Sequence, residues 1–168
     1  LQRLCKGMGI ILLALGITMI IGAASGAKSP LNPLSGIVNK QASISHSGLS
    51  FKRIHSMAEL EENIQNAKGK TLMLDFYADW CISCKEMEVN TFTNPEVSKQ
   101  LKQLVLVQAD VTVNSAESQA LLKKFGLYGP PGILFFSQNS EEQKNQRVIG
   151  YMSPERFTER LKQVIKTQ

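Results

Sequence analysis

The stretch that decides the fold reads Leu72-Met-Leu-Asp-Phe-Tyr-Ala-Asp-Trp-Cys-Ile-Ser-Cys84, an apolar run followed at once by two cysteines. The run indicates a buried strand, and residues 81–89 after it predict a helix. Cys81 and Cys84 therefore lie where a strand ends and a helix begins. The first turn of a helix offers unpaired N–H groups and a partial positive charge, which favour a thiolate over a thiol. A dithiol at this place indicates reversible thiol–disulfide exchange.

Other uses of a Cys-x-x-Cys pair fit the sequence less well. A structural zinc site needs four ligands, and the remaining candidates Cys5, His46 and His55 are scattered along the chain. Covalent haem attachment needs a histidine directly after the second cysteine, where Lys85 stands. A structural disulfide rarely closes so small a loop at the start of a helix. We therefore favour redox exchange, with no cofactor beyond the cysteine pair itself.

Position assigns a role to each thiol and to a nearby acid. Cys81 can expose its sulfur at the helix N-terminus and have its pKa lowered from ~8.5, so we expect it to attack a partner disulfide. Cys84, one turn further in, should be more buried and should resolve the mixed disulfide. Asp75 is an acid in an otherwise apolar strand, where burial is costly. It can lie beneath the dithiol and exchange a proton with Cys84, or it can pair with a buried lysine or water.

Two further features have more than one interpretation. Glu88 stands one helical turn beyond Cys84 and either adds negative potential there or belongs to a solvated helix face. Two carboxylates near the thiols would raise the thiol pKa values, against the effect of the helix end. The segment Gly129-Pro-Pro-Gly132 precedes a strand, and its X-Pro bond is either cis, as in some tight turns, or trans, which spacing alone favours. Asp79 and Glu86 are interpreted as surface charges.

The N-terminal part of the chain predicts a membrane segment. Residues 7–27 contain no charged side chain, and a helix of that length covers roughly the 30 Å of a bilayer core. It is either a retained transmembrane helix, over residues 1–27, or a signal peptide cleaved near Ala27. Length and flanking charges favour the retained span, and Leu1 in place of a starting Met favours the carboxyl-terminal piece of a larger protein. Both interpretations place the following domain outside the cytoplasm.

The formal net charge of +5 does not indicate nucleic-acid binding. Of the 19 Lys and Arg residues, 15 lie from Leu49 onward together with all 14 Asp and Glu residues. The other four flank or follow the apolar segment, where basic residues serve membrane topology. Residues 28–48 are rich in Ser, Pro, Asn and Gly and are interpreted as a flexible tether. One domain over residues 49–168 follows.

From Leu49 onward, predicted strands and helices alternate. We predict strands over residues 51–54, 71–77, 104–109, 132–136 and 147–151, with a polar turn between the last two. We predict helices after the capping residue Ser56, over 81–89, from Pro95, over 115–125, and after Ser153. This order indicates an α/β fold in which helices flank both faces of a mixed sheet, and the final two strands form its antiparallel part.

Together these residues resemble the thioredoxin superfamily: Trp80-Cys-x-x-Cys84, Asp75 six residues before the first cysteine, and Pro131 before a strand. More narrowly, residues 73–88, Thr91-Phe92, Leu134-Phe-Phe136 and Gly150-Tyr-Met are similar to the carboxyl-terminal domain of the DsbD family. Members of that family are thiol:disulfide interchange proteins of the Gram-negative inner membrane. The resemblance covers nearly the whole chain and is strongest over residues 70–92.

The resemblance implies a thioredoxin fold in the periplasm and a route for electrons. In the family, a membrane domain reduces this domain, which reduces an amino-terminal periplasmic domain of the same protein. Electrons then reach disulfide isomerases and cytochrome c maturation proteins. Carried over, Cys81 and Cys84 are the redox pair, Asp75 and Glu88 are the acids that tune it, and Pro131 is a cis-proline facing it. The membrane contact is made through residues 7–27.

One residue departs from the family pattern. The position before the cis-proline usually offers a backbone N–H to an extended partner segment, but Pro130 has none. We therefore expect partners to bind through the carbonyl of Pro130 and through apolar contacts around Trp80 and Tyr128.

Three other functions stay open: a stand-alone, membrane-tethered thioredoxin-like protein for cytochrome c maturation, a redox-inert adaptor, and an oxidase. The intact dithiol argues against the adaptor, and the acids argue against the oxidase, which needs a very stable thiolate.

Overall fold

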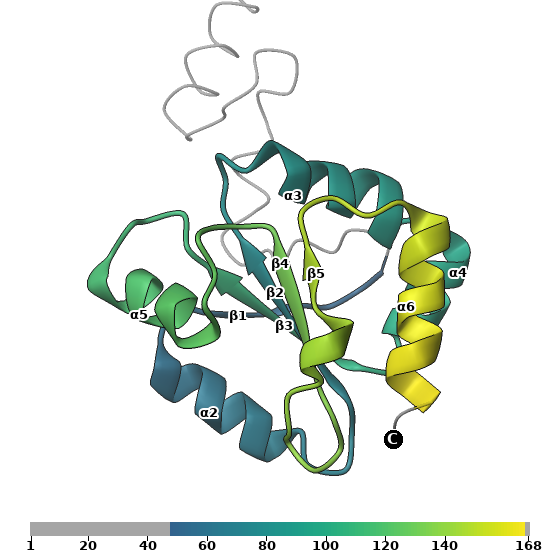
Figure 1. Ribbon diagram of the computed structural model, residues 1–168, viewed down its shortest axis with the longest axis horizontal. Coiled ribbons are helices and arrows are strands. Elements are labelled where there is room, and N and C mark those ends of the chain that lie inside the picture. Colours follow the sequence, from purple (N-terminus) through teal and green to yellow (C-terminus); the bar gives the residue numbers. More distant parts are fainter. Residues whose placement is uncertain (1–47, 167–168) are drawn as a thin grey trace, which may run out of the picture. The chain divides into compact units, whose positions relative to one another are not determined.

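The computed structural model describes residues 48–166 (Figure 1). The predicted membrane segment, nearly all of the tether, Cys5 and His46 lie outside these residues. Within residues 48–166, no helix combines the length and the apolar character needed to cross a bilayer.

A mixed sheet of five strands forms the centre of the domain, in the order β1-β3-β2-β4-β5. The strands are β1 (Lys52–Ile54), β2 (Leu72–Tyr77), β3 (Val105–Asp110), β4 (Gly132–Phe136) and β5 (Val148–Ile149). β1, β3 and β2 run parallel, whereas β4 is antiparallel to β2 and β5 is antiparallel to β4. β2 and β4 are buried at every position, which explains why both are apolar runs without alternation, apart from Asp75 in β2. The mixed sheet with a final antiparallel pair is as predicted.

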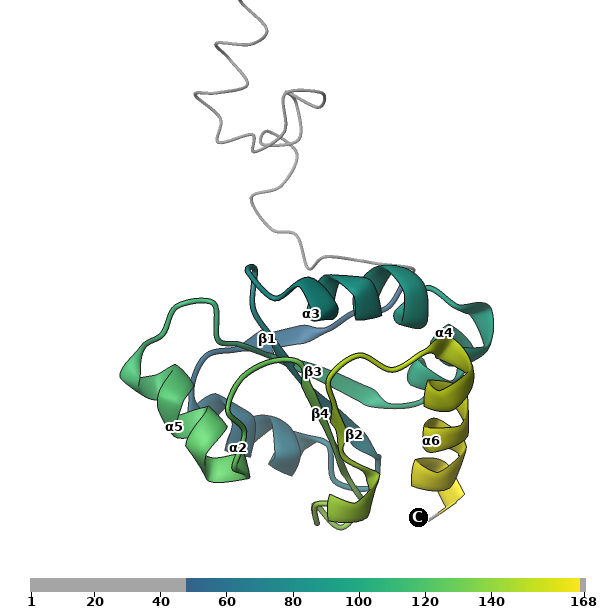
Figure 2. The ribbon, with the colours of Figure 1, turned by 45° about the horizontal axis from the view of Figure 1, so that its top comes forward.

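Helices cover both faces of this sheet, as Figures 1 and 2 show. The helical elements are α2 (Met57–Asn66), α3 (Ile82–Glu86), the π-helical η1 (Met87–Phe92), α4 (Pro95–Leu101), α5 (Ala116–Phe125) and α6 (Pro154–Lys166). Leu72, Leu74 and Phe76 of β2 pack with the core that includes α2 and α5. Met73, which points to the opposite face, packs with the core formed by η1, α4 and α6. Asp75 shares the face of Met73.

Local capping explains where two of the helices begin and end. The Ser56 hydroxyl accepts a hydrogen bond from the backbone N–H of Glu59, and the Glu59 carboxylate accepts one from the backbone N–H of His55. This is the predicted capping box with one difference: the Glu59 carboxylate accepts from the backbone N–H of His55, not from that of the cap residue Ser56. The Ser115 side chain caps α5 in the same way, and Gly126 ends that helix with a φ of 65°, which glycine adopts without strain.

Two predicted boundaries are wrong. The predicted helix over residues 81–89 instead divides into a short α3 and the π-helical η1, which carries the helical run to Phe92. The predicted strand over residues 147–151 is only two residues long, because Gly150 adopts a φ of 83° and ends the ladder. The polar turn before it contains a short 3-10 helix, η2 (Lys144–Gln146).

Packing of α6 against η1 yields a prediction about stability. Phe157 of α6 is fully buried, and its ring centroid lies 5.7 Å from that of Phe92. We expect Phe157→Ala to lower the free energy of unfolding by about 3–5 kcal/mol, measured by urea denaturation of the oxidised chain. Tyr128→Ala is the control, because this aromatic side chain is fully exposed and its removal should change stability by at most about 0.5 kcal/mol. Equal losses in the two variants would contradict this packing.

Candidate active site: a dithiol above a buried acid network

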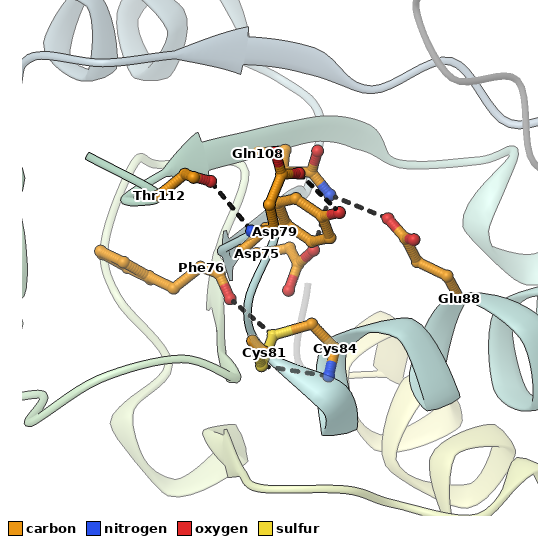
Figure 3. The surroundings of a disulfide bond; sticks show 9 residues. Asp75, Phe76, Asp79, Cys81, Cys84, Glu88, Gln108 and Thr112 are labelled. Carbon is orange, nitrogen blue, oxygen red and sulfur yellow. Dashed lines mark hydrogen bonds between the residues drawn. A yellow bond between two sulfur atoms is a disulfide. The ribbon is translucent and has the colours of Figure 1, made fainter. Parts of the chain in front are cut away.

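The two cysteines lie where β2 gives way to α3, as the sequence predicts. Cys81 and Cys84 form a disulfide with their Cα atoms 5.3 Å apart (Figure 3). Cys81 is also the N-cap of α3, since its sulfur accepts a hydrogen bond from the backbone N–H of Cys84 at 3.1 Å. A donor aimed at this sulfur stabilises negative charge on it, so the same N–H favours the Cys81 thiolate once the disulfide is reduced.

The expected exposure of Cys81 is not found. Cys81 is 5% exposed, hardly more than Cys84 at 3%. The physical reason is the capping geometry, which turns the Cys81 sulfur toward the helix it caps, where it is bonded to Cys84. The neighbours of Cys81 in sequence, Trp80 and Ile82, are 63% and 75% exposed. The Cys81 side chain is thus buried although both residues next to it in sequence expose apolar surface.

Asp75 lies in a polar row that crosses three strands. The strand register pairs Asp75 of β2 with Gln108 of β3, and Gln108 with Arg53 of β1, so all three side chains share one face of the sheet. The Gln108 Nε2 donates to Asp75 Oδ2 at 3.1 Å and makes a longer 3.5 Å bond to Glu88 Oε1 (Figure 3). The Gln108 Oε1 accepts from Arg53 Nε at 3.2 Å. One amide thus links two carboxylates to a guanidinium.

Burial gives Asp75 a proton affinity suited to exchange at neutral pH. Asp75 is only 4% exposed, and burial raises its pKa to about 7; the hydrogen bond from Gln108 opposes this rise, and the negative charge of Glu88 adds to it. The Cys84 sulfur lies 3.9 Å from the carbonyl oxygen of Phe76, the residue next to Asp75. In the view of Figure 3, the Asp75 carboxyl lies between Gln108 and the disulfide. Its hydrogen-bond partner is an amide, not the lysine of the alternative interpretation.

Glu88 is a second buried acid beside this row. It comes from η1 and is 8% exposed, so it does not belong to a solvated helix face. Its charge contributes to the raised pKa of Asp75, and it also acts on Tyr77, where burial and the Glu88 charge raise the pKa to about 12. Asp79 and Glu86 are exposed as predicted, although Asp79 also accepts a hydrogen bond from the Tyr77 hydroxyl at 3.2 Å.

The four predicted substrate-binding residues lie in loops. Trp80 keeps its ring exposed while its indole N–H donates to the carbonyl oxygen of Thr112 at 3.2 Å. Tyr128 is fully exposed in the loop before β4. The peptide bond between Pro130 and Pro131 is cis, as the family resemblance implies, and both prolines are partly buried.

Comparison with known proteins agrees with this geometry. A family model described as a thioredoxin-like domain matches residues 59–165. The chain belongs to the thioredoxin-like family. A thioredoxin from Thermus thermophilus, with a TM-score of 0.55 and 23% identity, shares the fold.

Within the thioredoxin-like family, the chain is similar to proteins named DsbD. The crystal structure of the Neisseria meningitidis DsbD c-terminal domain in the oxidised form matches with a TM-score of 0.58 and 36% identity, covering 67% of this chain and 98% of that one. The thiol:disulfide interchange protein DsbD of Ralstonia nicotianae is 42% identical over 99% of this chain. This chain covers 28% of the Ralstonia protein and 24% of the Actinobacillus pleuropneumoniae one, so it spans about a quarter of the length of such relatives.

Sequence reasoning missed Gln108 and Arg53 as members of this thioredoxin-like site. A signal for Gln108 was present, because it is the one polar residue in the run Leu104-Val-Leu-Val-Gln-Ala109 and is 4% exposed. Arg53 gave no such signal, because a charged residue in a short edge strand is common. Among residues 48–166, no cluster of three or more His, Cys, Asp or Glu side chains could hold a metal ion. The site therefore offers two sulfurs, two buried acids and the amide that joins them.

The raised pKa of Asp75 predicts how stability depends on pH. In the folded chain Asp75 keeps its proton up to about pH 7, whereas in the unfolded chain it loses the proton near the ordinary pKa of 3.8. Ionisation therefore favours the unfolded chain, and the stability of the fold falls progressively as the pH rises between these two values. The cost grows by at most about 1.4 kcal/mol per pH unit and is constant above the folded pKa. Asp75→Asn removes this titration, so its stability relative to the wild type should be higher at pH 8 than at pH 4.

Urea unfolding of the oxidised chain at the two pH values measures this difference. Glu86→Gln, an exposed acid on α3, is the matched control and should show no such change with pH. An Asp75→Asn effect that is equal at pH 4 and pH 8 would contradict the buried, proton-holding carboxyl.

Proposed function

We propose that this chain is a protein-disulfide reductase domain that relays electrons from a membrane-embedded dithiol to partner disulfides in the periplasm. The observation that carries this proposal is the Cys81–Cys84 disulfide at the N-terminus of α3, next to a buried acid that titrates near neutral pH. Such an acid can accept and return a proton during thiol–disulfide exchange. The similarity to proteins named thiol:disulfide interchange protein DsbD supports the same activity.

The reaction transfers two electrons in two exchanges. In the reduced chain, the Cys81 thiolate attacks one sulfur of the partner disulfide, so that a mixed disulfide forms and the other partner sulfur leaves as a thiolate that takes up a proton. Cys84 then loses its proton and attacks the Cys81 sulfur. The internal disulfide re-forms, and the second partner sulfur leaves and is protonated. The partner has gained two electrons and two protons; this chain has lost the two electrons and the proton of Cys84, and the second proton comes from water, which took it up when the Cys81 thiolate formed.

We propose a task for each residue of the site, supported by its contacts. The backbone N–H of Cys84 stabilises the attacking Cys81 thiolate. Asp75 takes the proton of Cys84 when the mixed disulfide is resolved, because its raised pKa lies near working pH. Asp75 and Glu88 together place negative charge near the thiols, which disfavours the thiolate and so favours loss of electrons. These acids suit a reductase better than an oxidase.

The proposed partners are those that the resemblance to the DsbD family implies. Electrons arrive from a membrane domain and leave to an amino-terminal periplasmic domain of the same DsbD-like protein, and from there reach disulfide isomerases and cytochrome c maturation proteins. The chain is held at the bacterial inner membrane by residues 7–27, with the thioredoxin-like domain in the periplasm. Support comes from the Ralstonia relative, which aligns with 99% of this chain. A stand-alone, membrane-tethered protein for cytochrome c maturation is the alternative.

Partner recognition is assigned to the exposed loops around the disulfide. Trp80 and Tyr128 project apolar surface that a partner can cover, which suits aromatic residues in interfaces. Pro131 presents its cis bond at the start of β4, and Pro130 lacks the N–H that an extended partner segment would accept. A partner therefore gains its affinity here from apolar contact and from hydrogen bonds that it donates to backbone carbonyl groups of this loop.

Trapping of the mixed disulfide tests the proposed activity. Cys84→Ala leaves Cys81 able to attack but removes the resolving thiol, so a covalent adduct should accumulate on Cys81 in a periplasmic extract. Non-reducing electrophoresis and mass spectrometry identify the adduct, and the Cys81→Ala, Cys84→Ala double variant is the control. Recovery of an amino-terminal domain of the same protein supports the relay. Absence of any adduct contradicts the reductase proposal, and a broad set of unfolded secreted proteins would favour an oxidase or isomerase.

Removal of one exposed aromatic ring tests the docking role of the loops. We expect Tyr128→Ser to lower kcat/KM for a protein disulfide by about tenfold, as for an interface residue whose loss costs roughly 1.4 kcal/mol. The rate with a small aromatic disulfide should stay unchanged, because that reagent needs no docking surface. Val89→Ser, at an apolar side chain of η1 that is 61% exposed, is the matched control. If the rate falls equally with the protein disulfide and with the small aromatic disulfide, Tyr128 acts in the chemistry and not in docking.

A further inference from the structure

The amide of Gln108 is fixed in one orientation by three partners, two carboxylates and one guanidinium. Its Nε2 directs hydrogen bonds to Asp75 and Glu88, and its Oε1 accepts from Arg53. An amide oxygen only accepts and an amide nitrogen only donates, so these roles cannot be exchanged. A rotated amide would place its oxygen against two carboxylates and leave the Arg53 N–H opposite an NH₂ group.

Arg53 is itself held in place from the edge of the sheet. Its Nη1 lies 3.3 Å from Asp110 Oδ2, and its guanidinium carbon lies 5.4 Å from the centre of the Tyr77 ring. These contacts fix the planar group so that its Nε meets the Gln108 oxygen. A partly exposed cation on β1 is thereby connected, through one side chain, to the acid beneath the disulfide.

We propose that Gln108 is a positioning residue that holds Asp75 and Glu88 as one coupled acid pair, and that Arg53 fixes its orientation and so sets the pH range of exchange at Cys81 and Cys84. The inference rests on the proposed function for its consequence, because it concerns regulation of the same site. Its geometric part does not depend on the proposed function. That part is the pair of acids joined by the Gln108 amide, which Arg53 orients from β1.

The charges and hydrogen-bond donors that face Asp75 decide whether removal of the Gln108 amide raises or lowers the pKa of Asp75. Glu88 faces it from η1, Cys84 lies within α3, and Arg53 with Asp110 lies beyond Gln108. A donor to a carboxylate stabilises the ionised form, so Gln108 lowers a pKa that burial raises. Without this donor Asp75 holds its proton more tightly and no longer accepts a proton from Cys84 at neutral pH.

Gln108→Met tests the proposal in the full chain, because it keeps the side-chain length and removes the amide. In the oxidised protein, we expect the midpoint of the Asp75 titration, followed by carboxyl ¹³C NMR, to rise by about one pH unit. In the reduced protein, the midpoint of Cys81 alkylation against pH should fall, because Asp75 is then neutral and repels the thiolate less. A variant that merely loosens the core would hydrate Asp75 and lower its midpoint instead, so the sign separates the two roles.

Substitutions of Arg53 test its orienting role. Arg53→Met should raise the Asp75 midpoint by a smaller amount than Gln108→Met, and Arg53→Lys should recover only part of the shift, since a lysine carries charge but not the planar N–H. Lys52→Met is the control: it removes a positive charge from the same strand, at an exposed residue whose side chain points to the other face. It should leave the midpoint unchanged.

The outcomes separate this inference from the proposed function. An unchanged or lowered Asp75 midpoint in Gln108→Met overturns the inference, even if the wild-type chain reduces disulfides. A raised midpoint supports it even if the wild-type chain proves inactive, in which case only the proposed function fails. If Gln108→Met does not fold, the Arg53 series decides alone, and equal midpoints in Arg53→Met and Lys52→Met then overturn the inference.

Discussion

A carboxyl group inside the central strand of the sheet is the constraint on which the site depends. Asp75 lies between apolar neighbours on β2, where an ionised group without partners would be costly to bury. The fold tolerates it because β3 brings the Gln108 amide to the same level and because the acid holds its proton up to about pH 7. The residue that weakens the core is thus the one that suits proton transfer at the disulfide.

In the proposed function, two opposing fields act on the cysteines, and they come from different parts of the structure. The N-terminus of α3, with the N–H of Cys84 aimed at the Cys81 sulfur, favours a thiolate. The negative charges proposed for Asp75 and Glu88 disfavour it from the sheet and from η1. Because the helix field acts most directly on the capping sulfur, it assists attack by Cys81. The acids act from beneath and disfavour the reduced, charged state of the pair, as a donor of electrons requires.

The sequence predicts local features of this site well and contacts between strands poorly. The β2 run, the α3 start and the Asp75 anomaly are visible because each follows from neighbouring residues. Gln108 and Asp75 are 33 positions apart in sequence, and Gln108 and Arg53 are 55 apart. Their meeting depends on the register of three strands, which hydrophobic pattern alone does not specify. The π-helical η1, which turns Glu88 inward, and the low exposure of Cys81 likewise depend on tertiary packing.

The residues proposed for tuning and those proposed for partner recognition lie in different parts of the structure. The acid network lies mainly on β1, β2 and β3, whose shared register leaves each member little freedom. Trp80 and Tyr128 lie in loops, and the link between them and the sheet is slight; the Trp80 indole, for example, is held by the Thr112 carbonyl alone among its described hydrogen bonds. Loops accept changes that strands do not, because few buried contacts depend on them. Partner preference can therefore change in the loops while the proton affinity beneath the disulfide is preserved by the sheet.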